Sequence, residues 1–241
     1  MYFVANWKMY GNLSSLNTLD KVIKFSKSKE IKKARLIYCP PYTLISSFSK
    51  KFRNCQIGIG GQNCHDSKNY GPYTGSISSR MLKNIGAHFV IIGHSENREN
   101  GEDDKLINLK IKSALEAKLK IIFCIGETLR EKKKKKTQSI LSKQIKAGLD
   151  GIKNKSSVFI AYEPVWAIGT GIIPKSKDLL KTIDFIKSRF KNRVPKILYG
   201  GSVNPNNINN LKEVNNIDGF LIGGASQNAN KFIDIVKKTY S

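Results

Sequence analysis

The chain has 241 residues, of which 40% are hydrophobic, so it can bury a large core, and its size fits one α/β barrel. No apolar run approaches the ~20 residues of a membrane span and no signal-peptide pattern opens the sequence, so we expect a cytoplasmic protein with no membrane partner. An excess of 42 lysines and arginines over 18 aspartates and glutamates gives a net charge of +24, which raises the hypothesis of a nucleic-acid or anionic-surface partner.

Short apolar runs alternate with amphipathic segments from one end of the chain to the other. This alternation favours parallel βαβ units over strand hairpins. No linker or break in composition divides the chain, so we expect one domain over residues 1–241, and eight strands suit a closed barrel. In chain order, the predicted strands cover residues 2–5, 35–39, 56–60, 89–92, 121–125, 158–162, 196–199 and 219–222.

Side chains suited to proton transfer follow three of these strands. Asn6 and Lys8 come after the first strand, His94 after the fourth and Glu163 after the sixth. Because the carboxyl ends of parallel strands meet at one end of a barrel, we expect these groups to share a site. Glu163 precedes a proline and a loop, so it is the candidate base, and burial under that loop would make it more basic.

His94 is the one histidine of three with a setting that suggests catalysis. His65 lies in a polar loop and His88 precedes a strand, so both fit structural roles. The residues after His94, Ser95–Glu96, resemble a helix start, and a helix N-terminus favours the neutral imidazole. His94 and Asn6 could then donate hydrogen bonds to substrate oxygens on which charge develops.

Glycine pairs follow the seventh and eighth strands. They stand at 200–201, before Ser202, and at 223–224. Glycines let backbone N–H groups come close to an anion, and barrels of this kind bind phosphate at these two strand ends. The loop after Glu163 ends in glycines at 169 and 171, and we expect it to act as a lid over a phosphate.

Two further segments and the cysteines are expected to lie outside the chemistry. The loop 62–75 is long for a barrel connection, which suggests binding or assembly. The densest basic run, 130–136, contains no aromatic side chain for stacking bases; we interpret it as the solvated start of a helix and expect no nucleic-acid partner. The four cysteines have no CxxC spacing, so we expect reduced thiols and no metal site.

Five segments stand out, in order, across the whole chain: Asn6-Trp-Lys-Met9, Gly93-His-Ser-Glu96, Ala161 to Gly171, Tyr199-Gly-Gly-Ser-Val203 and Gly223-Gly-Ala-Ser226. They resemble the signature segments of the triosephosphate isomerase family, in the same order. The resemblance implies a single-domain (β/α)8 TIM barrel over residues 1–241, a homodimer, and no cofactor or metal. It also implies proton transfer through an enediolate, which interconverts dihydroxyacetone phosphate and D-glyceraldehyde 3-phosphate.

The same resemblance implies a role for each candidate residue. Glu163 would be the proton-abstracting base and His94 the electrophile. Asn6 and Lys8 would bind substrate and stabilise the transition state, and Glu96 would be an acid beside the site. Four residues would contact the substrate phosphate: Gly169, Ser202, Gly223 and Gly224.

The chain departs from the family pattern at three places. The family usually has an acid at the position of Ser76 and an arginine at that of Asn97, and these two pair between subunits. Both the acid and the arginine are absent here, so one interface ion pair is lost and neither charge is left without its partner. Pro174, at the second hinge of the lid, cannot donate an N–H, which puts in doubt a closed-lid hydrogen bond to Tyr199.

Two other functions remain open from the sequence. The alternative enzyme is another phosphate-sugar barrel isomerase or an aldolase. An aldolase would need a strand-end lysine for a Schiff base, and Lys8 is the only candidate. A basic barrel that binds nucleic acid or an anionic surface is the non-enzyme alternative. A coupled assay with the two triose phosphates would discriminate among the three.

Overall fold

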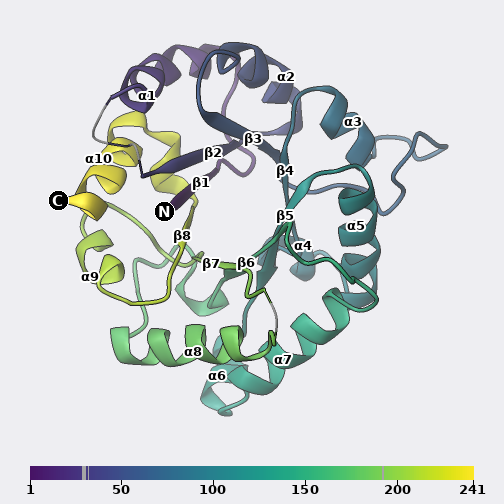
Figure 1. The fold of residues 1–241 in the computed structure, drawn as a ribbon, viewed down its shortest axis with the longest axis vertical. Helices are drawn as coiled ribbons and strands as arrows, with labels where there is room; N and C mark the ends of the chain where they lie inside the picture. The colour runs from purple at the N-terminus through teal and green to yellow at the C-terminus, as the bar shows by residue number, and fades with distance from the viewer. Residues whose placement is uncertain (29–30, 32, 192) are drawn as a thin grey trace.

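Eight parallel strands close into a barrel inside a ring of helices in the computed structural model, which describes residues 1–28, 31, 33–191 and 193–241 (Figure 1). The strands follow one another around the barrel in chain order, and β1 pairs with both β2 and β8. Every predicted strand is confirmed to within one residue at either end. The strands are β1 (Tyr2–Asn6), β2 (Arg35–Cys39), β3 (Ile57–Gly61), β4 (Phe89–Ile92), β5 (Lys120–Ile125), β6 (Val158–Tyr162), β7 (Lys196–Tyr199) and β8 (Gly219–Ile222).

The helices connect successive strands, so each strand runs in the same direction as its neighbours. The α-helices are α1 (Leu19–Ser26), α2 (Tyr42–Lys51), α3 (Ser79–Asn84), α4 (Ser95–Glu99), α5 (Asp104–Glu116), α6 (Leu129–Lys133), α7 (Thr137–Gly148), α8 (Ser176–Ser188), α9 (Ile208–Lys212) and α10 (Ala229–Tyr240). Short 3₁₀ turns cover Leu13–Thr18, Val165–Ala167 and Gly224–Gln227. None of the helices in the described residues is long and apolar enough to cross a membrane.

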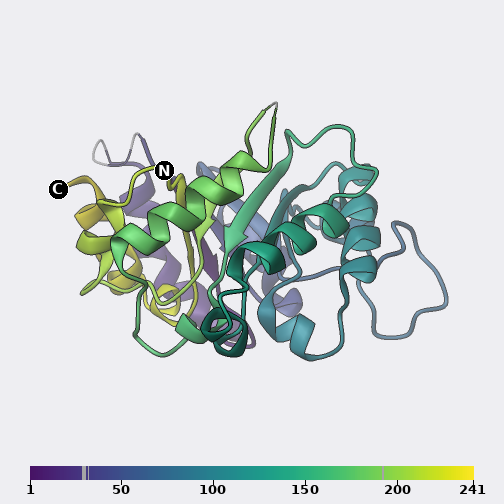
Figure 2. The same cartoon turned by 90° about the horizontal axis from the view of Figure 1, so that it is seen from below.

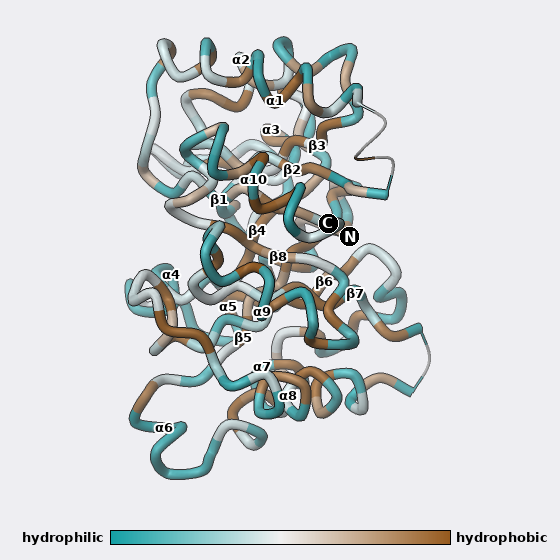
Figure 3. The backbone as a smooth tube through the Cα atoms, turned by 90° about the vertical axis from the view of Figure 1, so that its left-hand side faces the viewer, coloured by the Kyte–Doolittle hydropathy of each residue, from teal (hydrophilic) through white to brown (hydrophobic). Residues whose placement is uncertain are grey.

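The apolar residues form two buried layers. One layer packs between the outer face of the barrel and the helices, and the other fills the barrel itself with side chains such as Ile91, Ile122 and Leu221. Strands buried on both faces read as nearly continuous hydrophobic runs, which explains why the sequence pattern located them so closely. Figure 3 shows these hydrophobic runs along the strands and more hydrophilic stretches on the surrounding helices.

The basic run 130–136 covers most of a helix and the turn after it, whereas the prediction placed only a helix start there. Helix α6 begins one residue earlier, at Leu129, where Thr128 and Glu131 form a capping box by exchanging side-chain and backbone hydrogen bonds. The run therefore extends from α6 to the residue before α7. The long loop after β3 is confirmed, and it extends away from the barrel (Figures 1 and 2).

The seam between β1 and β8 depends on the absence of a side chain at Gly219. A Cβ there would lie 2.1 Å from the carbonyl oxygen of Tyr2, its partner in the register. We expect Gly219→Ala to lower the free energy of unfolding by about 1–3 kcal/mol, because two paired backbones would have to move apart. Urea denaturation measures this.

Gly224→Ala is the matched control for that measurement. Among the described residues, no heavy atom lies within 4 Å of the position of its Cβ. If the Gly219→Ala variant kept the wild-type denaturation midpoint, the seam would tolerate a side chain.

Candidate active site

A cavity of about 250 Å³ opens at the carboxyl ends of the strands. The sequence-predicted residues Asn6, Lys8, His94 and Glu163 all line it, together with Gly169, Ser202, Gly223 and Gly224. Of the predicted site residues, Glu96 alone is not among those that line the cavity. The cavity therefore joins groups that the sequence separates by more than two hundred residues.

Glu163 occupies the end of β6 as a buried carboxylate, with 2% of its surface exposed. Its backbone N–H donates to the carbonyl oxygen of Ile125, at the end of β5, over 2.8 Å. One carboxylate oxygen lies 3.3 Å from Nε2 of His94, and the other accepts a long 3.4 Å hydrogen bond from the backbone N–H of Ser95. Burial raises the pKa of Glu163, although His94, the Ser95 N–H and Lys8 oppose that rise.

His94 is the N-cap residue of α4, as its sequence position predicted. Its Nδ1 accepts a hydrogen bond from the backbone N–H of Glu96 over 3.3 Å, and a nitrogen that accepts carries no proton. The neutral ring then bears its proton on Nε2, the nitrogen that faces Glu163. This tautomer can donate a hydrogen bond into the cavity without carrying a positive charge.

Lys8 is held in one place by three separate contacts. Its backbone has φ of 53°, a left-handed conformation that is uncommon for a lysine. Its N–H donates to Oδ1 of Asn6, and its carbonyl oxygen accepts from Nε2 of Gln62 over 2.7 Å. Its ammonium group lies 2.6 Å from Oε1 of Glu96. Glu96 thus contacts the site through Lys8 and also lies 3.7 Å from Nδ1 of His94. Gln62 is a supporting residue that the sequence pattern did not indicate.

Ser202 ties the tip of the lid to the loop after β7. Its hydroxyl donates to the carbonyl oxygen of Ala167 over 2.8 Å and accepts from the backbone N–H of Gly171 over 3.0 Å. The lid segment therefore lies against the two glycine-rich strand ends that were predicted to bind phosphate. Ser202 therefore has two positions of interest: its hydroxyl forms hydrogen bonds with the lid, and the residue lines the cavity.

The base of the lid is held by a buried acid, Glu127, that the sequence analysis missed. It is 1% exposed and accepts hydrogen bonds from Nε1 of Trp166 over 3.0 Å and from the hydroxyl of Tyr162 over 3.2 Å. Burial raises the pKa of Glu127, opposed by these hydrogen bonds. Its position was visible in the sequence, because Gly126-Glu127 follows β5 just as Glu163 follows β6.

Lys132 packs on the other side of the same tryptophan. Its ammonium nitrogen lies 3.2 Å from the centroid of the Trp166 ring, which is a cation–π contact. The prediction that the run 130–136 is a solvated segment is therefore incomplete for Lys132, which also covers an aromatic ring. It fits the rest of the run after Lys132, where residues 133–136 are exposed.

Tyr199 is the residue whose hydrogen bond to the lid was put in doubt by Pro174. The hydroxyl of Tyr199 is buried and has no hydrogen-bond partner among the described residues. Burial raises its pKa well above the ordinary value, so it stays a neutral hydroxyl. Pro174 has no backbone N–H to donate to it. The hydrogen bonds that hold the lid in this structure involve Ser202 and Glu127.

Lys8 is poorly placed for Schiff-base chemistry, which weakens the aldolase alternative. A Schiff base needs a free amine, whereas the nitrogen of Lys8 is an ion-paired ammonium beside Glu96. Within the described part of the chain, no group of three or more histidine, cysteine, aspartate and glutamate side chains could hold a metal ion.

Comparison with known proteins assigns the chain to a family. The family model described as triosephosphate isomerase matches residues 1–239. Triosephosphate isomerase of Thermodesulfovibrio yellowstonii is 41% identical over 98% of both chains, and that of Dictyoglomus thermophilum is 41% identical over 97% of both.

The solved structures agree with these relatives. The crystal structure of triosephosphate isomerase from Bartonella henselae superposes with a TM-score of 0.88 at 37% identity and covers 98% of each chain. Both the fold and the sequence are thus matched over nearly their whole length. The chain belongs to the triosephosphate isomerase family.

Proposed function

We propose that Glu163 is the base that moves the proton in the reaction of this family, the interconversion of dihydroxyacetone phosphate and D-glyceraldehyde 3-phosphate. The observation that carries this assignment is a buried carboxylate 3.3 Å from Nε2 of a histidine whose Nδ1 is occupied as an acceptor. A desolvated carboxylate is a stronger base than one in water, and the neutral imidazole beside it is a hydrogen-bond donor. These are the two groups that an enediolate pathway requires.

The proposed steps balance in protons and electrons. Glu163 removes a proton from the carbon beside the carbonyl, and the electron pair of that C–H bond forms the enediolate double bond. The carbonyl oxygen gains the negative charge, which the N–H groups of His94 and Asn6 and the fixed ammonium of Lys8 stabilise. Glu163 then returns the proton to the neighbouring carbon, while the hydroxyl proton passes from one oxygen to the other.

In its present position, the carboxylate of Glu163 lies 3.3 Å from Nε2 of His94 and accepts a hydrogen bond from the Ser95 N–H. Its contact with the Ser95 N–H is 3.4 Å long, which is a weak hydrogen bond. Substrate entering the cavity would replace that contact and bring the carboxylate over the reacting carbons. Backbone N–H groups of Gly223 and Gly224 after β8 and of Gly169 in the lid would hold the phosphate, together with Ser202 after β7.

Glu163→Gln tests the assignment of the base. The amide keeps the shape of the side chain and cannot accept the proton, so we expect turnover to fall about a thousandfold or more while a substrate analogue still binds. The coupled triose phosphate assay measures it, with the exposed Glu213→Gln as control. Activity within about tenfold of wild type, a loss of under ~1.4 kcal/mol, would remove Glu163 from this role.

The pH dependence of kcat/KM in the wild type is a second test of the role of Glu163. A base must be unprotonated, so kcat/KM falls as the pH is lowered through the pKa of Glu163. Because burial raises that pKa above its ordinary value of 4.5, the fall should begin at a higher pH than for an exposed glutamate.

Lys132→Gln tests the anchor of the lid. The substitution removes a cation–π contact of ~0.5–2 kcal/mol from Trp166, and we expect kcat/KM to fall roughly two- to tenfold because the lid is less well held. Lys134→Gln, two residues along the same run and exposed, is the matched control. Equal kinetics in the two variants would mean that the ring contact does not matter for turnover.

We infer that the chain forms a two-fold homodimer through the loop after β3. Tyr70 and Tyr73 in this loop are 64% and 48% exposed, and Met9 and Leu13 beside the site are 94% and 67% exposed. Large exposed apolar side chains on neighbouring loops mark an interaction surface. In a two-fold pair, the loop of one subunit would cover the residues next to Lys8 of the other. The lost ion pair at Ser76 and Asn97 removes at most ~1 kcal/mol from such an interface.

Tyr73→Asp tests the interface. We expect sedimentation to show a dimer for the wild type at micromolar concentration, and a monomer with reduced activity for the variant, because a charge would be buried in the contact. Val194→Asp places the same charge on a residue that is 48% exposed before β7, and should leave the dimer intact. A fully active wild-type monomer at micromolar concentration would refute the inference.

Two broader features complete the proposal. We infer that residues 1–241 act as one domain, because the strands that close the barrel come from both ends of the chain. We also place the protein in the cytoplasm, since its four cysteines are free thiols and three of them are buried, which suits a reducing compartment.

A further inference from the structure

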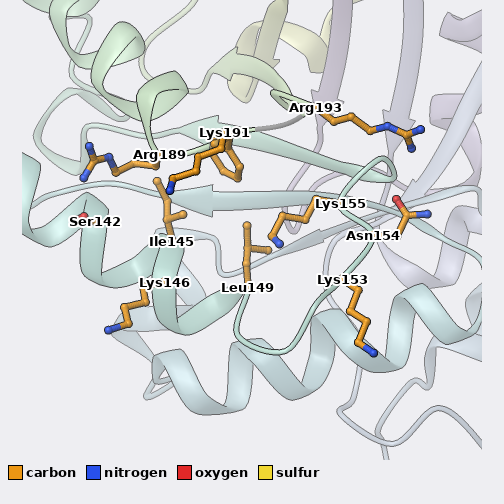
Figure 4. Close-up of a pocket in the computed structure, with 11 residues that line it drawn as sticks. Ser142, Ile145, Lys146, Leu149, Lys153, Asn154, Lys155, Arg189, Lys191 and Arg193 are labelled. Carbon is orange, nitrogen blue, oxygen red and sulfur yellow. The ribbon is translucent and has the colours of Figure 1, made fainter.

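A second hollow, larger than the active site, lies at the opposite end of the barrel. It measures about 790 Å³ and is formed by the end of α7, the loop before β6 and the loop between α8 and β7 (Figure 4). These segments precede their strands, whereas the catalytic groups follow theirs, so the two cavities open on different ends. The isomerase reaction makes no use of this hollow.

Among the described residues that line this hollow, six carry a positive charge and none carries a carboxylate. Its floor is apolar and consists of Ile145, Leu149 and Phe190. The nearest acid in sequence, Asp150, lines a different depression. The cationic residues are Lys146, Lys153, Lys155, Arg189, Lys191 and Arg193.

Structural roles account for only part of this cluster. Lys146 sits in the last turn of α7, where a cation complements the helix dipole, and Lys155 donates to the carbonyl oxygen of Ile152 over 2.7 Å. Arg189 packs on the ring of Phe185. Lys153 and Lys191 form no ion pair among the described residues. Like charges gathered around one concavity repel each other. Among the described residues, no carboxylate forms an ion pair with any of the six.

We propose that this hollow binds a small molecule carrying several phosphate groups, of the nucleoside triphosphate type. Its volume falls in the range of small-molecule sites, and several ammonium groups match several phosphates at once. Figure 4 shows Lys155 and Lys191 reaching toward Ile145 and Leu149, while the other four cations lie around them with their charged ends pointing outward. An apolar floor below a cationic rim suits an anion with an apolar part.

The arrangement of the cations favours a small ligand over nucleic acid. A single strand needs a groove that follows its backbone and exposed aromatic faces on which bases stack. Here the cations encircle one hollow, and its one aromatic residue among those described, Phe190, is 9% exposed. A compact polyanion therefore fits better than a chain of nucleotides.

Isothermal titration of the intact protein with ATP, without divalent cations and at low ionic strength, tests the proposal. Glycerol 3-phosphate, which resembles the substrate but has no carbonyl to react, is present in excess to occupy the active site. We expect binding of one ATP that weakens as salt is added. In the triple variant Lys153→Gln, Lys155→Gln, Lys191→Gln the affinity should fall at least about tenfold.

A second triple variant matches the change in charge. Lys24→Gln, Lys27→Gln and Lys177→Gln remove three lysines from α1, the residue after it and α8, and should leave ATP affinity within about twofold of the wild type. Isomerase activity and thermal melting, followed for both variants, show that each is folded. Equal losses in the two variants would overturn the proposal in favour of a diffuse effect of net charge.

Two further ligands identify what the hollow prefers. Inorganic tripolyphosphate that competes with ATP supports the site, and weaker binding than ATP assigns a contribution to the apolar floor. A short single-stranded DNA that binds more tightly than ATP, and that loses affinity in the first triple variant, would overturn the small-molecule assignment. No measurable ATP binding would overturn it as well.

Discussion

The buried carboxylate of Glu163, which we propose as the base, is the constraint on which this site depends. Glu163 is 2% exposed, and burial of a charge is costly unless its surroundings are polar and ordered. The barrel provides that order, because the backbone of Glu163 is hydrogen-bonded to the end of β5. Glycine at 126 and 200 leaves room for it: a Cβ would lie 1.8 Å from the Glu163 carbonyl oxygen or 2.7 Å from its Cγ, respectively.

The groups around Glu163 stabilise charge without cancelling its basicity. Nδ1 of His94 accepts a hydrogen bond from the helix start that follows it, so the ring can present an N–H donor on Nε2 toward Glu163. The positive charge comes from Lys8, whose ammonium group is shared with Glu96. His94, the Ser95 N–H and Lys8 lower the pKa of Glu163, but burial raises it by more, so the carboxylate stays more basic than an exposed one. The positions of His94 and Lys8 and their charges therefore together determine how basic Glu163 is.

The sequence was sufficient for the fold and for the residues that end strands, and insufficient for the contacts between them. All eight strands are buried on both faces, so each is a short apolar run, and the polar groups that follow them meet at one end. Three supporting residues were not predicted, because each acts through a partner that is distant in the sequence. Glu127 and Lys132 contact Trp166, and Gln62 contacts Lys8. A basic run also gives no sign in the sequence of which lysine turns toward an aromatic ring.

The two ends of the barrel differ in how they can hold an anion, and the difference follows from the direction of its helices. Helices that begin after the strands present free N–H groups to the active site, so glycine-rich turns there can fix one phosphate in one orientation, as proton transfer to either carbon demands. The same helices end before the next strand, where their carbonyl groups repel anions. Any anion bound at that end must be held by side chains, and the six cations of the second hollow provide them. Flexible lysines tolerate several binding geometries, which suits a site for recognition and would not suit catalysis.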